Sequence, residues 1–214
     1  RNVAHEPGFD RGIDIVFLQQ LQQADSATAI MRWNFHVAYL RAHSASAEHG
    51  LATFQEGARA FAHVVGGEHQ AELRGLVLQA FLDTATAPWQ RWGTSALYYW
   101  IDSGPVGGDS IRQGDLITIH YEGRSLEDGR IFDDTERSGQ PLTYRVGDPD
   151  QVIEGLAVAV SLLKAGCSGA FVIPSSLAFG ARGVGGSLPP YSPVHYRVAV
   201  EKLHRDLNRR SEAS

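Results

Sequence analysis

The most informative stretch of this 214-residue chain is residues 116–133, LITIHYEGRSLEDGRIFD. In its first part Ile117, Ile119 and Tyr121 alternate with their neighbours, which is the period-2 pattern of a β-strand. The pair Asp128-Gly129 follows, and Asp-Gly is a strong signal for a tight hairpin turn. A second strand is therefore expected at 130–132. The whole stretch predicts a β-hairpin.

The rest of the second half predicts a small domain around this hairpin. Aromatic and β-branched residues are concentrated at 97–101, 170–173 and 194–203, which predicts further strands. Residues 151–163 predict the one clear helix, because apolar residues recur at helical spacing and Gly166 lies just beyond its end. Strands around one helix form an α+β domain with a mostly antiparallel sheet, one face of which the helix must cover.

The first half of the chain follows a different pattern. Only Pro7 of the 9 prolines precedes Pro88, and a long stretch without proline favours helices because proline interrupts helical hydrogen bonds. Apolar residues recur at helical spacing through 10–85, so we expect three or four amphipathic helices in an antiparallel helical bundle. The predicted fold class is α+β, with three regions: a helical domain at 1–92, the sheet domain at 93–205 and a polar tail at 206–214.

The helical region carries more apolar surface than a small bundle needs. Trp33, Phe35 and Val37 place apolar side chains on more than one side of a single helix, whereas a bundle helix needs one buried stripe. We therefore expect residues 10–85 to pack on the sheet domain or to mediate association, either self-association or binding to a larger protein complex.

The composition excludes several classes of function. Hydrophobic residues make up 43% and charged residues 20% of the chain, as in an ordinary soluble globular protein. A net charge of −5 gives no electrostatic reason to expect nucleic acid as a partner, and no apolar run is long enough for a transmembrane segment. The single cysteine, Cys167, excludes an internal disulfide. His36 and His43 could share one helix face, but no third ligand is evident, so we expect no metal site.

A series of short motifs runs through the second half in a fixed order. They are Ile119-His120-Tyr121-Glu122-Gly123, Leu126-Glu127-Asp128-Gly129, Phe132-Asp133, Val152-Ile153 with Gly155, Ala178-Phe179-Gly180 and Leu188-Pro189-Pro190. In this order and spacing they resemble the FKBP-type peptidyl-prolyl cis–trans isomerases, over roughly half of the chain. The resemblance implies an FKBP-like antiparallel sheet wrapped around a short helix, with an apolar prolyl pocket between them.

The resemblance also implies which residues form the pocket. Catalytic roles would fall on Tyr121, Phe132, Asp133, Ile153, Phe179 and Tyr196, and substrate-binding roles on Leu142, Val152, Leu156 and Leu188. Tyr121 and Asp133 would orient the site, and the backbone N–H of Ile153 would hold the substrate chain.

Three of these positions depart from the family's pattern. Leu142 stands where an aromatic residue is usual, Leu156 where a tryptophan often forms the pocket floor, and Phe179 where a tyrosine hydroxyl normally contacts the substrate. The first two exchange flat aromatic surface for aliphatic surface. The third removes a hydrogen-bond donor, a loss of roughly 0.5–1.5 kcal/mol. We therefore expect weaker catalysis than in members of the family with the usual residues.

The implied activity is acceleration of X–Pro bond rotation in client proteins, with proline-containing polypeptides as partners. Such rotation needs no cofactor, metal or nucleophile, because the enzyme need only bind the twisted amide better than either planar form. The alternative is a catalytically weak binding module, attached to a larger assembly by the helical domain. The three departures leave this alternative open.

The expected location follows from the family and from the first half of the chain. The family occurs in the cytoplasm and, in bacteria, in the cell envelope, often behind a helical extension. Because the chain begins with Arg1 rather than Met and its first half is predicted to be helical, we expect an exported bacterial protein. Its place would be the periplasm or cell envelope, with a lipid anchor as one mode of attachment. A cytoplasmic location is the alternative.

Overall fold

The structure is a computed structural model that describes residues 67–85, 87–102, 104 and 108–205. The chain divides into two compact units, Arg1–Leu73 and Arg74–Ser214. The helices predicted before residue 67 and the polar tail predicted at 206–214 lie outside the described residues. The predicted sheet domain lies in the second unit, which carries the candidate site.

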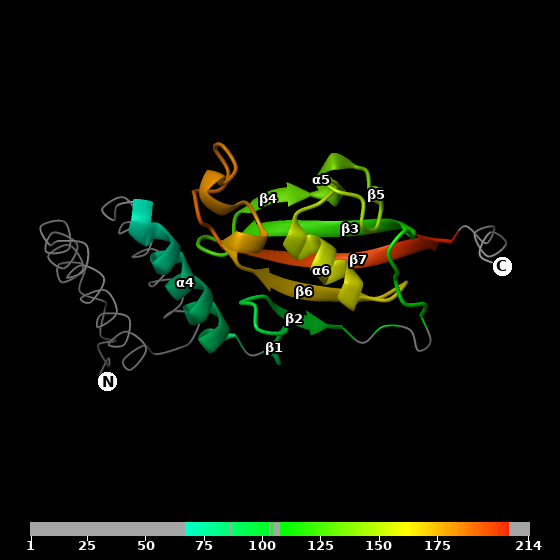
Figure 1. Ribbon diagram of the computed structural model, residues 1–214, viewed down its shortest axis with the longest axis horizontal. Coiled ribbons are helices and arrows are strands. Elements are labelled where there is room, and N and C mark those ends of the chain that lie inside the picture. Colours follow the sequence, from blue (N-terminus) through cyan, green and yellow to red (C-terminus); the bar gives the residue numbers. More distant parts are fainter. Residues whose placement is uncertain (1–66, 86, 103, 105–107, 206–214) are drawn as a thin grey trace, which may run out of the picture. The chain divides into compact units, whose positions relative to one another are not determined.

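An antiparallel sheet forms the body of the second unit (Figure 1). Its strands, in chain order, are β1 Gln90–Arg91, β2 Tyr98–Ile101, β3 Leu116–Ser125, β4 Ile131–Asp134, β5 Leu142–Arg145, β6 Ser168–Ile173 and β7 Val194–His204. They lie in the spatial order β1-β2-β6-β7-β3-β4, and β5 pairs with the first part of β3. The long strands β3 and β7 pair along nearly their whole length, so they form the centre of the sheet.

One helix, α6 Glu154–Leu162, covers a face of the sheet, and Figure 1 shows it lying across β3, β7 and β6. Its buried face includes Leu156 and Val160. The helix approaches β6 so closely that a Cβ added at Gly155 would collide with Ile173, which explains the glycine at this position. The other helical elements are α4 Gly67–Thr84, α5 Thr135–Ser138 and the short 3-10 helices η1 Ser175–Leu177 and η2 Gly180–Arg182.

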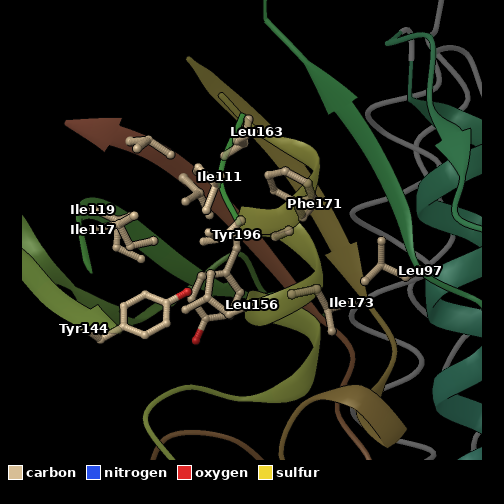
Figure 2. Close-up of a cluster of buried hydrophobic side chains, with 14 of the residues drawn as sticks. Leu97, Ile111, Ile117, Ile119, Tyr144, Leu156, Leu163, Phe171, Ile173 and Tyr196 are labelled. Carbon is tan, nitrogen blue, oxygen red and sulfur yellow. The ribbon is translucent and has the colours of Figure 1, made fainter. Parts of the chain in front are cut away.

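The core lies between α6 and the sheet (Figure 2). Ile117 and Ile119 of β3 and Phe171 and Ile173 of β6 are fully buried there. Burying a side chain of this size stabilises the fold by about 1.5–3 kcal/mol relative to leaving it exposed. The core therefore fixes α6 on the sheet, together with the pocket residues that the helix and the sheet carry.

The elements predicted for the second half are present, with shifted ends. β3 extends to Ser125, and β4 begins at Ile131 after the Asp128-Gly129 turn. α6 begins at Glu154 rather than at residue 151, because Ile153 has an extended backbone with φ −62° and ψ 151°. β1, α5 and β5 carry no sequence signal, since two to four residues are too few to show a period.

The second unit begins earlier than the boundary predicted between residues 92 and 93. It includes α4 from Arg74 onward. The ring of Phe81 on α4 lies 5.9 Å from that of Trp89 and 6.0 Å from that of His195 on β7. The rings of Trp89 and His195 lie 6.1 Å apart, so the three rings form a closed cluster. The second half of α4 therefore belongs to the sheet domain.

Candidate functional site

Aromatic rings from separate parts of the sheet domain meet beside the core. Phe132 of β4 lies 5.6 Å from Phe179, which precedes η2, and 5.7 Å from Tyr196 of β7, both edge to face. Tyr121 of β3 lies 5.7 Å from Tyr196. Only 2% of Tyr196 is exposed, whereas Tyr121, Phe132 and Phe179 are half-buried and can still be reached from solvent. The arrangement is an apolar wall with a buried back and an open front.

Gly123 makes this arrangement possible. A Cβ at this position would lie 2.8 Å from Cζ of Phe132 and 3.0 Å from two ring carbons of Tyr196. The two rings therefore pack directly against the β3 backbone. Gly123 is missing from the predicted site residues, although it closes the first motif of the sequence. An isolated glycine inside a strand pattern is the signal for such a close approach.

A hydrogen bond joins the two residues expected to orient the site. The hydroxyl of Tyr121 donates to Oδ2 of Asp133 at 2.9 Å. Burial, this hydrogen bond and the nearby carboxylate raise the pKa of Tyr121 to about 12. The Tyr121 hydroxyl therefore keeps its proton at neutral pH, and its direction is fixed by Asp133.

The neighbouring residues Asp134 and Thr135 hold this part of the site in place. Oγ1 of Thr135 accepts a hydrogen bond from the backbone N–H of Tyr121 at 2.9 Å and donates one to its carbonyl at 3.1 Å. Asp134 caps α5 by accepting from the N–H of Glu136 at 2.8 Å. Because Asp134 serves as the cap, Asp133 remains directed at Tyr121. Thr135 is not among the predicted site residues, since a buried threonine after a strand has no distinctive pattern.

The start of α6 brings three of the predicted residues to the site. Val152 and Ile153 are half-buried and pack against the core, and Leu156 is 3% exposed. The carbonyl of Ile153 accepts the first helical hydrogen bonds, from Leu156 and Ala157. No acceptor for the Ile153 N–H lies within the part of the chain that the structure describes. This donor is therefore available to a bound chain.

The remaining predicted residues line the same core. Leu188 is 4% exposed, and Leu142 and Phe179 are half-buried against the core cluster. Leu142 pairs in register with Ile119 at the start of β5. The predicted apolar residues thus gather at one place in the fold, and Asp133 joins them through Tyr121.

A hollow with a largely polar and charged lining borders the face of the sheet that points away from α6. Its volume is about 340 Å³, and its lining includes His120, Glu122, Glu136, Ser168 and Arg197. His120 and Glu122 of β3 and Arg197 of β7 alternate along their strands with residues that face α6. Tyr121 borders this hollow as well as the aromatic wall. Among the described residues, no group of three or more His, Cys, Asp or Glu is arranged to hold a metal ion.

Comparison with known proteins finds relatives for the sheet domain. The sequence profile of the FKBP-type peptidyl-prolyl cis-trans isomerase family matches residues 107–201. The outer membrane protein MIP of Legionella longbeachae is 37% identical over 101 residues, which are 47% of this chain and 41% of that protein. FK506-binding protein 1 of Saccharomyces cerevisiae is 38% identical over 98 residues, which are 46% of this chain and 84% of that protein.

A solved structure supports the same fold. The crystal structure of a peptidyl-prolyl cis-trans isomerase from Pseudomonas syringae superposes with a TM-score of 0.54 at 23% identity, covering 66% of this chain and 98% of that one. The FKBP-like antiparallel sheet expected from the sequence is therefore confirmed. The chain spans less than half the length of several of the relatives that it matches, at 45%, 42% and 41%. Since it also covers most of the yeast protein, the chain belongs to the FKBP-type peptidyl-prolyl cis–trans isomerase family.

Proposed function

We propose that this protein accelerates rotation about X–Pro bonds in polypeptides. The observation that carries the proposal is the half-open apolar wall of Tyr121, Phe132, Phe179 and Tyr196, with the backbone N–H of Ile153, which has no acceptor among the described residues. The wall offers a prolyl ring a surface that excludes water. The donor offers the peptide chain next to that ring one hydrogen bond.

The physical basis is selective binding of the twisted amide. Rotation about a peptide bond costs about 18–20 kcal/mol because resonance makes the amide planar. Twisting removes the resonance and reduces charge separation in the amide, so an apolar, water-free pocket favours the twisted form. In this proposal Phe132, Phe179 and Tyr196 enclose the proline. Tyr121, held by Asp133, orients the substrate, and Ile153 holds its backbone.

The same residues set a limit on the catalytic strength. Phe179 has no hydroxyl to offer the substrate, and Leu142 and Leu156 present aliphatic surface, with Leu156 almost fully buried at 3% exposure. A missing neutral hydrogen bond corresponds to about 0.5–1.5 kcal/mol, or about threefold to tenfold in rate. We therefore expect measurable but reduced turnover.

The test is an isomerisation assay on short peptides that differ in the residue before proline. The full chain should accelerate cis-to-trans exchange above the uncatalysed rate for at least part of the panel. Phe132→Ala should lower the rate, and Arg91→Ala, far from the pocket on β1, serves as the matched surface control. Rates equal to the uncatalysed ones across the whole panel would refute the proposal.

A second candidate function is a docking module that binds prolyl segments with little catalysis. The specific observation in its favour is the loss of the hydroxyl at Phe179, which lies directly against Phe132. Phe179→Tyr separates the two candidates. An isomerase limited by the missing donor should gain about threefold to tenfold in kcat/KM. A docking module should gain peptide affinity without a matching gain in turnover.

For the location, we propose the periplasm of a bacterium, with attachment to the envelope by a lipid anchor. The support is the 37% identity to the outer membrane protein MIP of Legionella longbeachae. None of the described helices is long and apolar enough to cross a membrane. Fractionation of the native host tests the proposal, and recovery of the protein only in the cytosolic fraction would contradict it.

We also propose that residues 10–85 mediate association, as the excess of apolar residues there indicates. The mass of the full chain in solution should then correspond to an oligomer or a complex. A monomer at every concentration tested, which also binds no protein from a native lysate, would contradict this.

A further inference from the structure

Residues 183–188 form the loop after η2, and hydrogen bonds between its own backbone groups make it compact. The N–H groups of Ser187 and Leu188 both donate to the carbonyl of Val184, at 2.9 and 2.8 Å, and the N–H of Val184 donates to the carbonyl of Leu188 at 2.9 Å. Leu188 anchors the loop in the core cluster. The short helix η2 connects the loop to Phe179, whose ring contacts Phe132 at the edge of the proposed pocket.

The tip of this loop is bound by Arg130, 57 residues earlier in the chain. Nη2 of Arg130 donates to the carbonyl of Ser187 at 2.5 Å. Arg130 lies two residues before Phe132, immediately before β4, the strand that supplies this ring to the aromatic wall. The backbone carbonyl of Arg130 accepts from the N–H of Ser125, and its N–H donates to Oδ1 of Asp128 at 3.1 Å. The backbone of Arg130 is therefore fixed in a tight hairpin, and its side chain is hydrogen-bonded to the loop.

The same hairpin is attached to α4. Glu127 forms an ion pair with Arg74, and both side chains are only 4% exposed. Burial lowers the pKa of Arg74 to about 10, so the guanidinium remains charged at neutral pH. Removing one partner of such a pair leaves a buried charge without compensation, which strongly disfavours the packed arrangement. Loss of either partner should therefore disturb the packing of the hairpin against α4.

We propose that Arg130 is a positioning residue that holds the 183–188 loop at the mouth of the prolyl pocket, and that α4 fixes Arg130 in place through the Arg74–Glu127 pair. The proposal rests on the proposed isomerase function and adds a role for the segment that precedes the sheet. Arg130 touches no substrate. It acts through the Ser187 carbonyl, so it should affect how tightly the peptide is held rather than how fast the bound amide rotates.

The first experiment removes and restores the contact in the full chain. Arg130→Ala should raise KM for a peptide containing Ala-Leu-Pro-Phe by about threefold to tenfold, while kcat stays within about twofold. Arg130→Lys keeps a cationic donor and should recover part of the affinity. Arg91→Ala is the matched control, because Arg91 also donates to turn carbonyls, those of Thr94 and Ser95, but far from the pocket.

The second experiment tests the connection to α4. Glu127→Gln leaves Arg74 without its counter-charge and should raise KM in the same way as Arg130→Ala. The double variant Arg74→Met with Glu127→Leu replaces the pair by apolar side chains of similar size, which often preserves packing. It should return KM towards that of the parent. A KM that stays high in the double variant while the fold is intact would overturn the role of α4.

Hydrogen exchange provides a readout that does not depend on activity. In Arg130→Ala the amides of Val184, Ser187 and Leu188 should exchange faster, while those of Ala170 and Phe171 in β6 stay protected. Unchanged loop exchange together with unchanged KM would overturn the inference. If the parent chain shows no catalysis, the proposed function fails, and loop exchange alone then decides whether Arg130 holds the loop.

Discussion

The two faces of the sheet are built from alternate residues of the same strands, yet they differ in chemistry. On β7, Tyr196 and Val198 face α6 and are buried, whereas His195 and Arg197 face the other way. The face towards α6 collects rings and aliphatic side chains. The opposite face carries ion pairs such as Arg197–Asp102, with Nη2 and Oδ2 2.8 Å apart. The proposed catalysis therefore depends on the uncharged face.

His195 is an exception on the opposite face, because Phe81 of α4 and Trp89 in the segment after it pack against its ring. The rings of Phe81 and Trp89 lie 6.0 and 6.1 Å from it. Burial, with Arg197 and Arg124 nearby, lowers the pKa of His195 to about 4, and Glu122 opposes this shift only in part. The two faces therefore differ in residue type, and the opposite face also differs along its length, because α4 covers the part around His195.

The largest effect should come from filling the space beneath the rings. Gly123→Val places atoms where Phe132 and Tyr196 now lie against the backbone, with the first Cβ already 2.8 Å from Phe132. We expect a loss of about 3 kcal/mol in the free energy of unfolding, measured by urea denaturation, and at least about tenfold in kcat/KM. Gly75→Ala in α4 is the control, since a Cβ there meets nothing within 4 Å. An active Gly123→Val variant would show that the rings do not form the pocket.

The next effect concerns the covered part of the opposite face. Since the folded pKa of His195 is about 4 and the ordinary pKa of a histidine is 6.5, the unfolded chain binds a proton between these pH values that the folded chain does not. The free energy of unfolding should therefore fall as the pH drops from 6.5 to 4, by about 2–3 kcal/mol from this residue. His195→Phe should lose this part of the pH dependence. Identical pH profiles for the two proteins would contradict the buried, neutral histidine.

A smaller effect is expected from the hydrogen bond between Tyr121 and Asp133. Tyr121→Phe removes the 2.9 Å hydrogen bond to Asp133 but keeps the ring. The rate constant kcat/KM should fall by about threefold to tenfold, corresponding to about 0.5–1.5 kcal/mol. In a double-mutant cycle with Asp133→Ala, the two changes should not be additive. Additive losses would mean that the two side chains act separately.

The smallest effect should come from the exposed part of the opposite face. Arg197→Gln breaks the pair with Asp102, whose two side chains are 45% and 24% exposed. Exposed pairs of this kind contribute about 0–1 kcal/mol, so thermal unfolding and the isomerisation rate should change little. A large loss of activity in this variant would contradict the claim that catalysis depends only on the face towards α6.

The parts of the fold that follow from local sequence were predictable. Asp128-Gly129 specifies its turn within a few residues, and the helix at 151–163 has enough turns to show its period. β5 forms by pairing with a strand distant in the chain, as Leu142 does with Ile119, and β1 has only two residues, too few to show a period.

The site shows the same division. The family motifs placed Tyr121, Phe132 and Tyr196 close together, and their rings do meet. Gly123 is needed because Phe132 and Tyr196 pack against its backbone, and Arg130 is hydrogen-bonded to the Ser187 carbonyl. Both contacts join residues distant in the chain, so a single sequence does not reveal them.

The short outer strands have a consequence for a protein proposed to handle unfolded chains. An extended polypeptide can add itself to a bare sheet edge by backbone pairing, which leads to trapping and aggregation. Here the two-residue β1 covers part of β2, and β4 and β5 divide the outer side of β3 between them. Within the described part of the chain, no long, regular edge is thus offered as a template. Clients would be taken up through their prolyl side chains and released again, without being recruited as an additional strand.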